Sequence, residues 1–207
     1  MYPKSYLLLV LAILPYTLLA QHTRFAVKGG LNLSRDKFEV YEAGVPLHLT
    51  TEVVASYHLG GVMEFKMKDS RRLFQMEVLY TGNGMLLRET ELFKRKRLNL
   101  TQLSIPLLMK YEAKEDLCFN LGGYFGRILN AQELNSLGQL TPIKDRFQMF
   151  DLGLLLGFEF KVNPKFSFDL RYNYGLLNFN NDDAFEETLT KRVYQNRTVN
   201  YGMVYKF

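Results

Sequence analysis

Apolar and polar side chains alternate along most of this 207-residue chain. Successive side chains of a β-strand point to opposite faces, so a period of two residues predicts a strand with one apolar and one polar face. Each alternating segment has about ten or more residues, enough for a tilted strand to cross a bilayer. The pattern predicts eight strands, near 24–34, 55–68, 72–82, 98–112, 117–127, 148–162, 165–176 and 197–207.

The connections between these segments alternate between short and long. The short ones are 69–71, 113–116 and 163–164, and the long ones are 35–54, 83–97, 128–147 and 177–196. Short periplasmic turns and longer external loops are typical of even-stranded outer-membrane barrels. The fold prediction is therefore all-β: an eight-stranded, antiparallel, up-and-down transmembrane β-barrel. Pro106 lacks a backbone N–H, so we expect a bulge or a local break in the fourth strand.

Periodicity alone does not say which face points inward, because a soluble barrel has the same alternation with its apolar face inside. The polar face carries many charges, and an isolated buried ion costs several kcal/mol. Side chains just fill the interior of an eight-stranded barrel. We therefore predict a polar lumen filled by cross-paired charges, with small residues such as Gly30, Gly60, Gly122 and Gly202 leaving room for long neighbours. An open pore is the alternative. The predicted charge network is Glu64, Lys66, Glu77, Lys110, Glu112, Asp151, Glu159, Asp169 and Arg171.

The first twenty residues have the parts of a secretory signal peptide. Lys4 precedes an apolar stretch over 6–19, and Ala20 follows it. An uncleaved membrane anchor is the alternative, but the stretch is short for a spanning helix and Pro15 interrupts it. The predicted organisation is a cleaved signal peptide over 1–20 and a single barrel domain over 21–207.

The last strand ends in an aromatic pattern. Tyr201, Met203, Tyr205 and Phe207 share one face. The series Gly202, Tyr205 and Phe207 resembles the terminal signal by which bacterial barrels are recognised for assembly. We therefore expect the barrel assembly machinery to be a partner during biogenesis.

The amino-acid composition limits the classes of partner that we expect. The chain has 26 basic and 21 acidic residues, a net charge of +5, which is too mild an excess to indicate a nucleic-acid partner. Its 13 Tyr and 16 Phe suit the aromatic girdles of a membrane barrel. The one cysteine, Cys118, has no partner for an internal disulfide.

Candidate chemistry is sparse. The three histidines, His22, His48 and His58, lack metal-ligand spacing, and we predict no catalytic, cofactor-binding or metal site. Small barrel enzymes that trim lipid A use a His and a Ser on the outer wall. Ser56 and His58 share a face, but that face is the inward one here. A lipid A-modifying enzyme is thus an alternative, and the prediction is a non-enzyme.

A basic run closes the second long connection. Its side chains could hold the phosphates of outer-leaflet lipopolysaccharide through charge-assisted hydrogen bonds. An ordinary solvated loop rim is the alternative. The run is Lys94, Arg95, Lys96 and Arg97.

Three segments, 25–34, 103–111 and 196–207, resemble the PorT-like outer-membrane β-barrel family of Bacteroidetes-type bacteria. The resemblance implies an integral protein of the Gram-negative outer membrane, exported by its signal peptide and in contact with outer-membrane lipid. We expect a structural or surface-interaction role through loop display and envelope integrity. One alternative is an accessory factor in protein secretion or assembly across the outer membrane, with an envelope or secretion protein as partner. The other is a small-solute pore.

Overall fold

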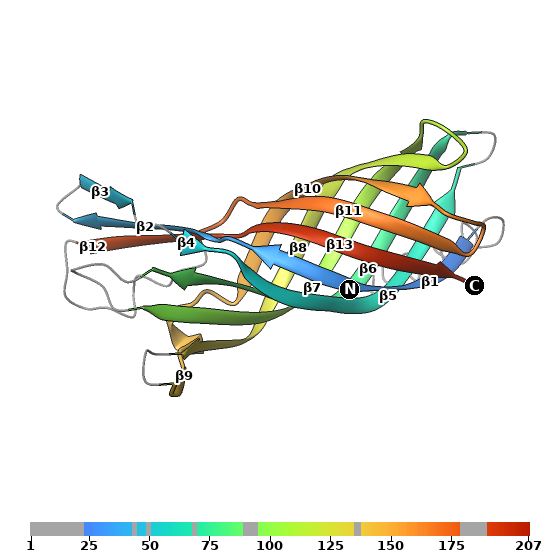
Figure 1. The fold of residues 1–207 in the computed structure, drawn as a ribbon. Coiled ribbons are helices and arrows are strands. Elements are labelled where there is room, and N and C mark those ends of the chain that lie inside the picture. Colours follow the sequence, from blue (N-terminus) through green and yellow to red (C-terminus); the bar gives the residue numbers. More distant parts are fainter. Residues whose placement is uncertain are drawn as a thin grey trace, which may run out of the picture.

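Eight long strands form a closed antiparallel barrel (Figure 1). The computed structural model describes residues 23–42, 45–48, 51–67, 70–88, 95–134, 138–178 and 190–207. Each strand pairs with its neighbour in the chain, and β1 pairs with β13 to close the ring. The barrel strands are β1 (Thr23–Ser34), β5 (Val54–Lys66), β6 (Arg72–Leu87), β7 (Lys96–Glu112), β8 (Leu117–Leu134), β10 (Phe150–Lys161), β11 (Phe166–Gly175) and β13 (Arg197–Lys206).

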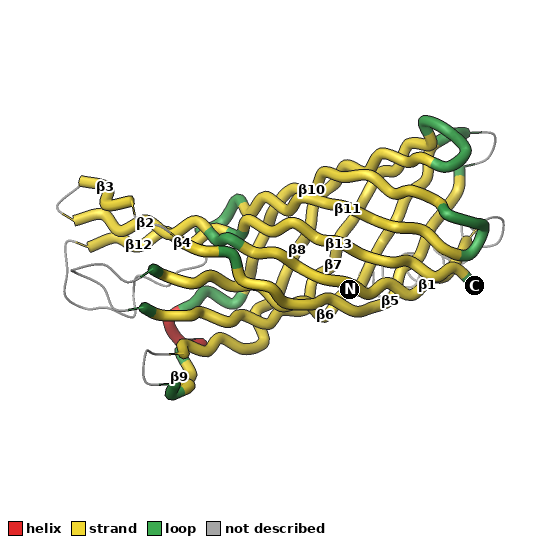
Figure 2. The backbone as a smooth tube through the Cα atoms, viewed as in Figure 1, coloured by secondary structure: helices red, strands yellow, loops and turns green. Residues whose placement is uncertain are grey.

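All eight predicted strands are confirmed. The predicted long connections, however, are not simply loops, because they contain further strands. Beyond the barrel, β2 (Lys37–Glu42) pairs with β12 (Thr190–Gln195), and this pair continues the β1–β13 ladder outward. β2 also pairs with β3 (Val45–His48). The other short elements are β4 (Thr51–Glu52), β9 (Leu140–Pro142) and the 3-10 turn η1 (Lys144–Arg146). Figure 2 shows this strand structure extending past the barrel at the end with the long connections, called the outer end below.

The apolar face of the barrel points outward. Leu31, Leu121 and Leu156 are at least 60% exposed, whereas Lys28 and Glu64 on the inner face are 2% exposed. This arrangement is the reverse of a soluble barrel and matches a lipid-facing wall around a polar lumen. None of the helical segments in the described part of the chain has the length and hydropathy of a transmembrane helix.

The wall has two local irregularities, and Pro106 accounts for one of them. The β6–β7 ladder is interrupted between Leu107 and Ser104, around Pro106, and resumes in the same register. The predicted local break is therefore present, while the register shift of β7 lies against β8, between Thr101 and Gln102.

The inward glycines serve two purposes. A Cβ built on Gly30, Gly60 or Gly122 would lie within 2.0 Å of a carbonyl oxygen on the neighbouring strand. At these positions glycine permits close backbone approach in a curved wall. At Gly202 glycine also leaves room for a long neighbour, because a Cβ there would lie 2.9 Å from the Lys28 side chain.

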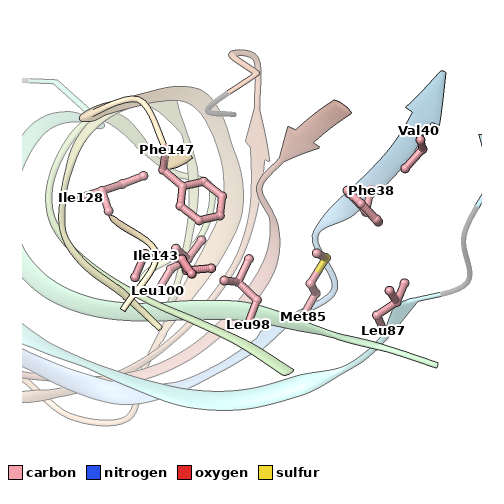
Figure 3. Packing of buried hydrophobic residues seen from close by; sticks show 10 residues of the cluster. Phe38, Val40, Met85, Leu87, Leu98, Leu100, Ile128, Ile143 and Phe147 are labelled. Atoms are coloured by element: carbon pink, nitrogen blue, oxygen red, sulfur yellow. The ribbon is translucent and has the colours of Figure 1, made fainter. Parts of the chain in front are cut away.

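At the outer end the inner face becomes apolar. The side chains gathered there, called the apolar plug, come from β2, β6, β7, β8 and the segment around η1 (Figure 3). Above the membrane the outer wall meets water, so apolar side chains gain by turning inward. The apolar plug comprises Phe38, Val40, Met85, Leu87, Leu98, Leu100, Ile128, Ala131, Ile143 and Phe147.

Candidate functional site

The inner half of the lumen is filled by eight charged side chains in two groups of four. In one group, Lys28 and Arg171 each bridge Glu77 and Asp169, with Arg171 2.9 Å from Glu77 and 2.8 Å from Asp169. In the other group, Lys110 and Lys206 each bridge Glu64 and Glu159. These two groups are called the ion quartets. Each has two acids and two bases, so its formal charge is balanced.

The ion quartets close this stretch of the lumen to water. Their side chains are at most 8% exposed. Such burial is incompatible with a water-filled channel at this level. Two further members of the predicted charge network lie elsewhere: Lys66 and Glu112 are at the inner mouth, 3.2 Å apart and partly exposed, where Lys161 lies 2.6 Å from Glu112.

Above the quartets the lumen is polar but uncharged. The imidazole Nδ1 of His58 lies 2.7 Å from Asn32 Oδ1, which also accepts a hydrogen bond from Asn200 at 2.6 Å. The Ser56 hydroxyl donates to the carbonyl oxygen of Gly82 at 2.6 Å. Both residues therefore have structural hydrogen-bond partners on the lumen side, and the arrangement does not reproduce a Ser–His pair on the outer wall.

Two buried carboxyl groups lie between this polar level and the apolar plug. Asp151 accepts hydrogen bonds from Tyr124 at 3.0 Å and Asn196 at 3.2 Å. Asp36 accepts one from the backbone N–H of Arg197 at 3.3 Å. The ion pairs found among the described residues include neither carboxylate. Burial raises the pKa of the Asp36 carboxyl well above its usual value, and the nearby Asp151 acts in the same direction.

The structure thus separates Asp151 from the charge network predicted for it and adds Asp36, which sequence reasoning missed. Asp36 lies in the segment assigned to a loop. The signal that could have found it is the continued alternation of Ser34, Asp36 and Phe38, all of which are buried. Asp36 and Asp151 with the amide side chains beside them, Asn83, Gln102 and Asn196, are called the carboxyl layer.

The outer wall carries a furrow over β1, β11 and β13. Its upper part is a pocket of about 640 Å³ whose wall combines apolar side chains with Arg35, Lys37 and Arg197 and with the acidic Asp36 and Glu39. Lys37 lies 3.0 Å from Glu39. Its lower part is an apolar pocket of about 380 Å³ beside Gly29 and Gly30. Tyr201 lines both parts, so they are adjacent along the wall.

The basic side chains of the furrow stand at the upper edge of the apolar wall. Arg35 lies directly after β1, two residues beyond the outward Leu33, and Arg197 precedes Val199 on β13. Arg197 is held in place: its guanidinium lies 3.6 Å from the centre of the Tyr174 ring and donates to the carbonyl oxygens of Gly175 and Asn196.

The predicted lipopolysaccharide contact lies nearer the outer end of the barrel than the furrow does. Lys94 is outside the described residues, and Arg95, Lys96 and Arg97 are exposed. Lys96 lies 2.9 Å from Glu133, and Arg97 Nε donates to Asn99 at 3.0 Å. Arg97 is six residues beyond Leu103, an outward apolar residue of β7, which corresponds to roughly 15 Å of height in a tilted strand.

The residues of the predicted assembly signal lie at the inner end of β13 and just after it. Gly202 is buried and Phe207 is 75% exposed. The Tyr205 and Phe207 rings are 5.5 Å apart, and the Phe207 N–H donates to the carbonyl oxygen of Phe25 at 3.0 Å. The predicted signal peptide, 1–20, is outside the described residues.

Comparisons with known proteins agree with this geometry. The model of the family described as "Outer membrane protein beta-barrel domain" matches residues 19–181, and the chain belongs to that family. It is accordingly an outer-membrane β-barrel protein. No curated protein matches it.

Solved structures show the same fold. Neisserial surface protein A (NspA) is similar with a TM-score of 0.55 and 14% identity, over 90% of this chain and 100% of that one. The outer membrane protein OprG from Pseudomonas aeruginosa is similar with a TM-score of 0.52 and 15% identity, over 90% of this chain and 97% of that one.

Proposed function

We propose that this protein is a non-enzymatic, non-conducting barrel of the Gram-negative outer membrane, exported by its signal peptide, with a structural and surface-interaction role. Its partner at the membrane is a phosphorylated acyl lipid of the outer leaflet, of the lipopolysaccharide class. The observation that carries the proposal is the furrow, in which a basic rim stands directly above an apolar floor.

The furrow matches the two parts of such a lipid. An acyl chain fits against Tyr201, Leu31 and the apolar pocket beside Gly29 and Gly30, where the missing side chain of the outward Gly29 deepens the wall. A phosphate then lies level with Arg35 and Arg197. Charge-assisted hydrogen bonds to phosphate are roughly twice as strong as neutral ones, and the fixed guanidinium of Arg197 loses little freedom on binding.

The test compares the furrow with the higher basic run. One variant carries Arg35→Gln and Lys37→Gln, and a second carries Arg95→Gln and Lys96→Gln. Lys144→Gln, an exposed site on η1, is the single-charge control. Each protein is stripped of lipid, refolded in micelles, incubated with purified lipopolysaccharide and analysed by native mass spectrometry.

We expect the first variant to retain at least tenfold less lipid than the wild type and the control. A loss confined to the second variant would move the contact to the run Lys94, Arg95, Lys96 and Arg97. Equal retention by all four proteins would refute a specific headgroup contact.

The aromatic terminus is proposed to act in biogenesis. Phe207 is exposed and directly follows the strand that closes the barrel, so the assembly machinery can reach it. Deleting Phe207 should lower the amount of folded barrel in the outer membrane severalfold, as judged by heat-modifiable gel migration of membrane fractions. An unchanged amount would contradict the proposed signal formed with Gly202 and Tyr205.

Within the family we propose kinship with the PorT-like branch, on the resemblance of segments 25–34, 103–111 and 196–207. That kinship would make an accessory role in secretion the second candidate. Deletion of the gene in its host, followed by measurement of secreted protein, separates the two: unchanged secretion with altered envelope permeability favours the structural role.

A further inference from the structure

Two carboxylate oxygens in the carboxyl layer are buried without a partner. Asp36 is 0% exposed and Asp151 is 1% exposed. Asp36 Oδ2 and Asp151 Oδ1 have no hydrogen-bond partner among the described residues. Both side chains line one small cavity. Each orphaned carboxylate oxygen is costly in a low-dielectric interior, and the charge of Arg197, which acts on both carboxylates without forming an ion pair with either, offsets only part of that cost.

The remaining walls of the cavity suit a cation. Asn83, Gln102 and Asn196 add side-chain amide groups, and Leu100 and Ile128 of the apolar plug close the top. Carboxylate and amide oxygens are hard ligands, which suit Ca²⁺ and Mg²⁺. The described residues hold no group of three or more His, Cys, Asp or Glu at one site, so amide oxygens must complete any such ligand set.

We propose that the carboxyl layer binds one divalent metal ion of the calcium type, with Asp36 and Asp151 as its charged ligands. The ion would balance both carboxylates and join β10 to the segment between β1 and β2. This inference goes beyond the proposed function, because the site lies inside the barrel and does not depend on lipid at the furrow.

The size of the cavity favours Ca²⁺ over the alternatives. It leaves no room for a water molecule beside the side chains. A Ca²⁺ ion sits about 2.3–2.6 Å from its oxygen ligands, closer than a hydrogen-bonded water. Mg²⁺ usually keeps several of its waters, which this cavity does not accommodate. Asp36 and Asp151 are far apart in the sequence, and the ion would fix their approach.

The experiment uses the full mature barrel refolded in micelles with CaCl₂ or with EDTA. Each sample is desalted into metal-free buffer, and bound calcium is measured by inductively coupled plasma mass spectrometry. The variants are Asp36→Asn and Asp151→Asn, singly and together, and Asp145→Asn on η1 is the matched control because that carboxylate is exposed. Heat-modifiable migration in EDTA checks that every variant folds.

We expect about one calcium per barrel in the wild type and the Asp145 variant, and at least a tenfold loss in the double variant. Calcium should also raise the unfolding midpoint of the wild type and leave that of the double variant unchanged. Two results would overturn the proposal. If the wild type retains no calcium, Asp36 and Asp151 share a proton in place of an ion. If the wild type and the double variant retain equal amounts of calcium, the ion binds elsewhere.

Discussion

The two ends of the lumen handle buried charge in opposite ways. In the ion quartets every carboxylate faces two cationic side chains. The two carboxylates of the carboxyl layer form no ion pair among the described residues and accept hydrogen bonds only from Tyr124, Asn196 and the backbone N–H of Arg197. Buried ions are tolerated when they are paired and hydrogen-bonded, and are costly otherwise. Removing a charge should therefore destabilise the quartets and relieve the carboxyl layer.

Breaking a quartet should have the largest effect. Lys110→Met removes the cation that bridges Glu64 and Glu159, leaving two buried carboxylates with Lys206 alone. We expect the free energy of unfolding in micelles to fall by about 3–5 kcal/mol, as measured by urea titration. A loss below about 1 kcal/mol would mean that water enters this level of the lumen.

Opening the apolar plug should have the next largest effect. Leu100 is 5% exposed and lines the cavity of the carboxyl layer from above. Leu100→Ala should lower the free energy of unfolding by about 3 kcal/mol through the cavity it leaves. It should also speed exchange of any ion held beneath it. A stable Leu100 variant would indicate that the long connections pack independently of the barrel.

Neutralising the carboxyl layer should change stability in the opposite direction. In EDTA, Asp36→Asn removes a buried carboxyl group whose ionised form is disfavoured by burial, while keeping the shape of the side chain. The free energy of unfolding should rise by about 1 kcal/mol at neutral pH. In the same titration with CaCl₂ the wild type should be more stable than the variant, because only the wild type then binds the ion. A destabilised variant in EDTA would show that the carboxylate is already compensated.

Removing charge at the inner mouth should have the smallest effect. Lys66 is 38% exposed in its side chain and lies 3.2 Å from Glu112, which Lys161 also contacts. Exposed pairs of this kind contribute about 0–1 kcal/mol, so Lys66→Met should leave the urea midpoint nearly unchanged. This variant is also the control for Lys110→Met, since both replace a lysine that is paired to glutamate.

The strand count and the alternation of short and long connections could be predicted from the sequence because both depend on local periodicity and turn residues. The inward side of each strand could be chosen because charges such as Glu77 and Arg171 are too many for a dry core. The candidate sites were harder to predict from the sequence. Asp36 lay in a predicted loop, and the furrow joins strands from both ends of the chain, so neither is visible as a motif.

The sequence by itself determined an eight-stranded outer-membrane barrel with a charged lumen, since a period of two and short turns act over neighbouring residues. Only the tertiary structure decided how the charges pair. Lys28 meets Asp169 across 141 positions, and Asp151 leaves the network to share a cavity with Asp36. Barrel closure brings such residues together, and the register that sets their height comes from the pairing of whole strands.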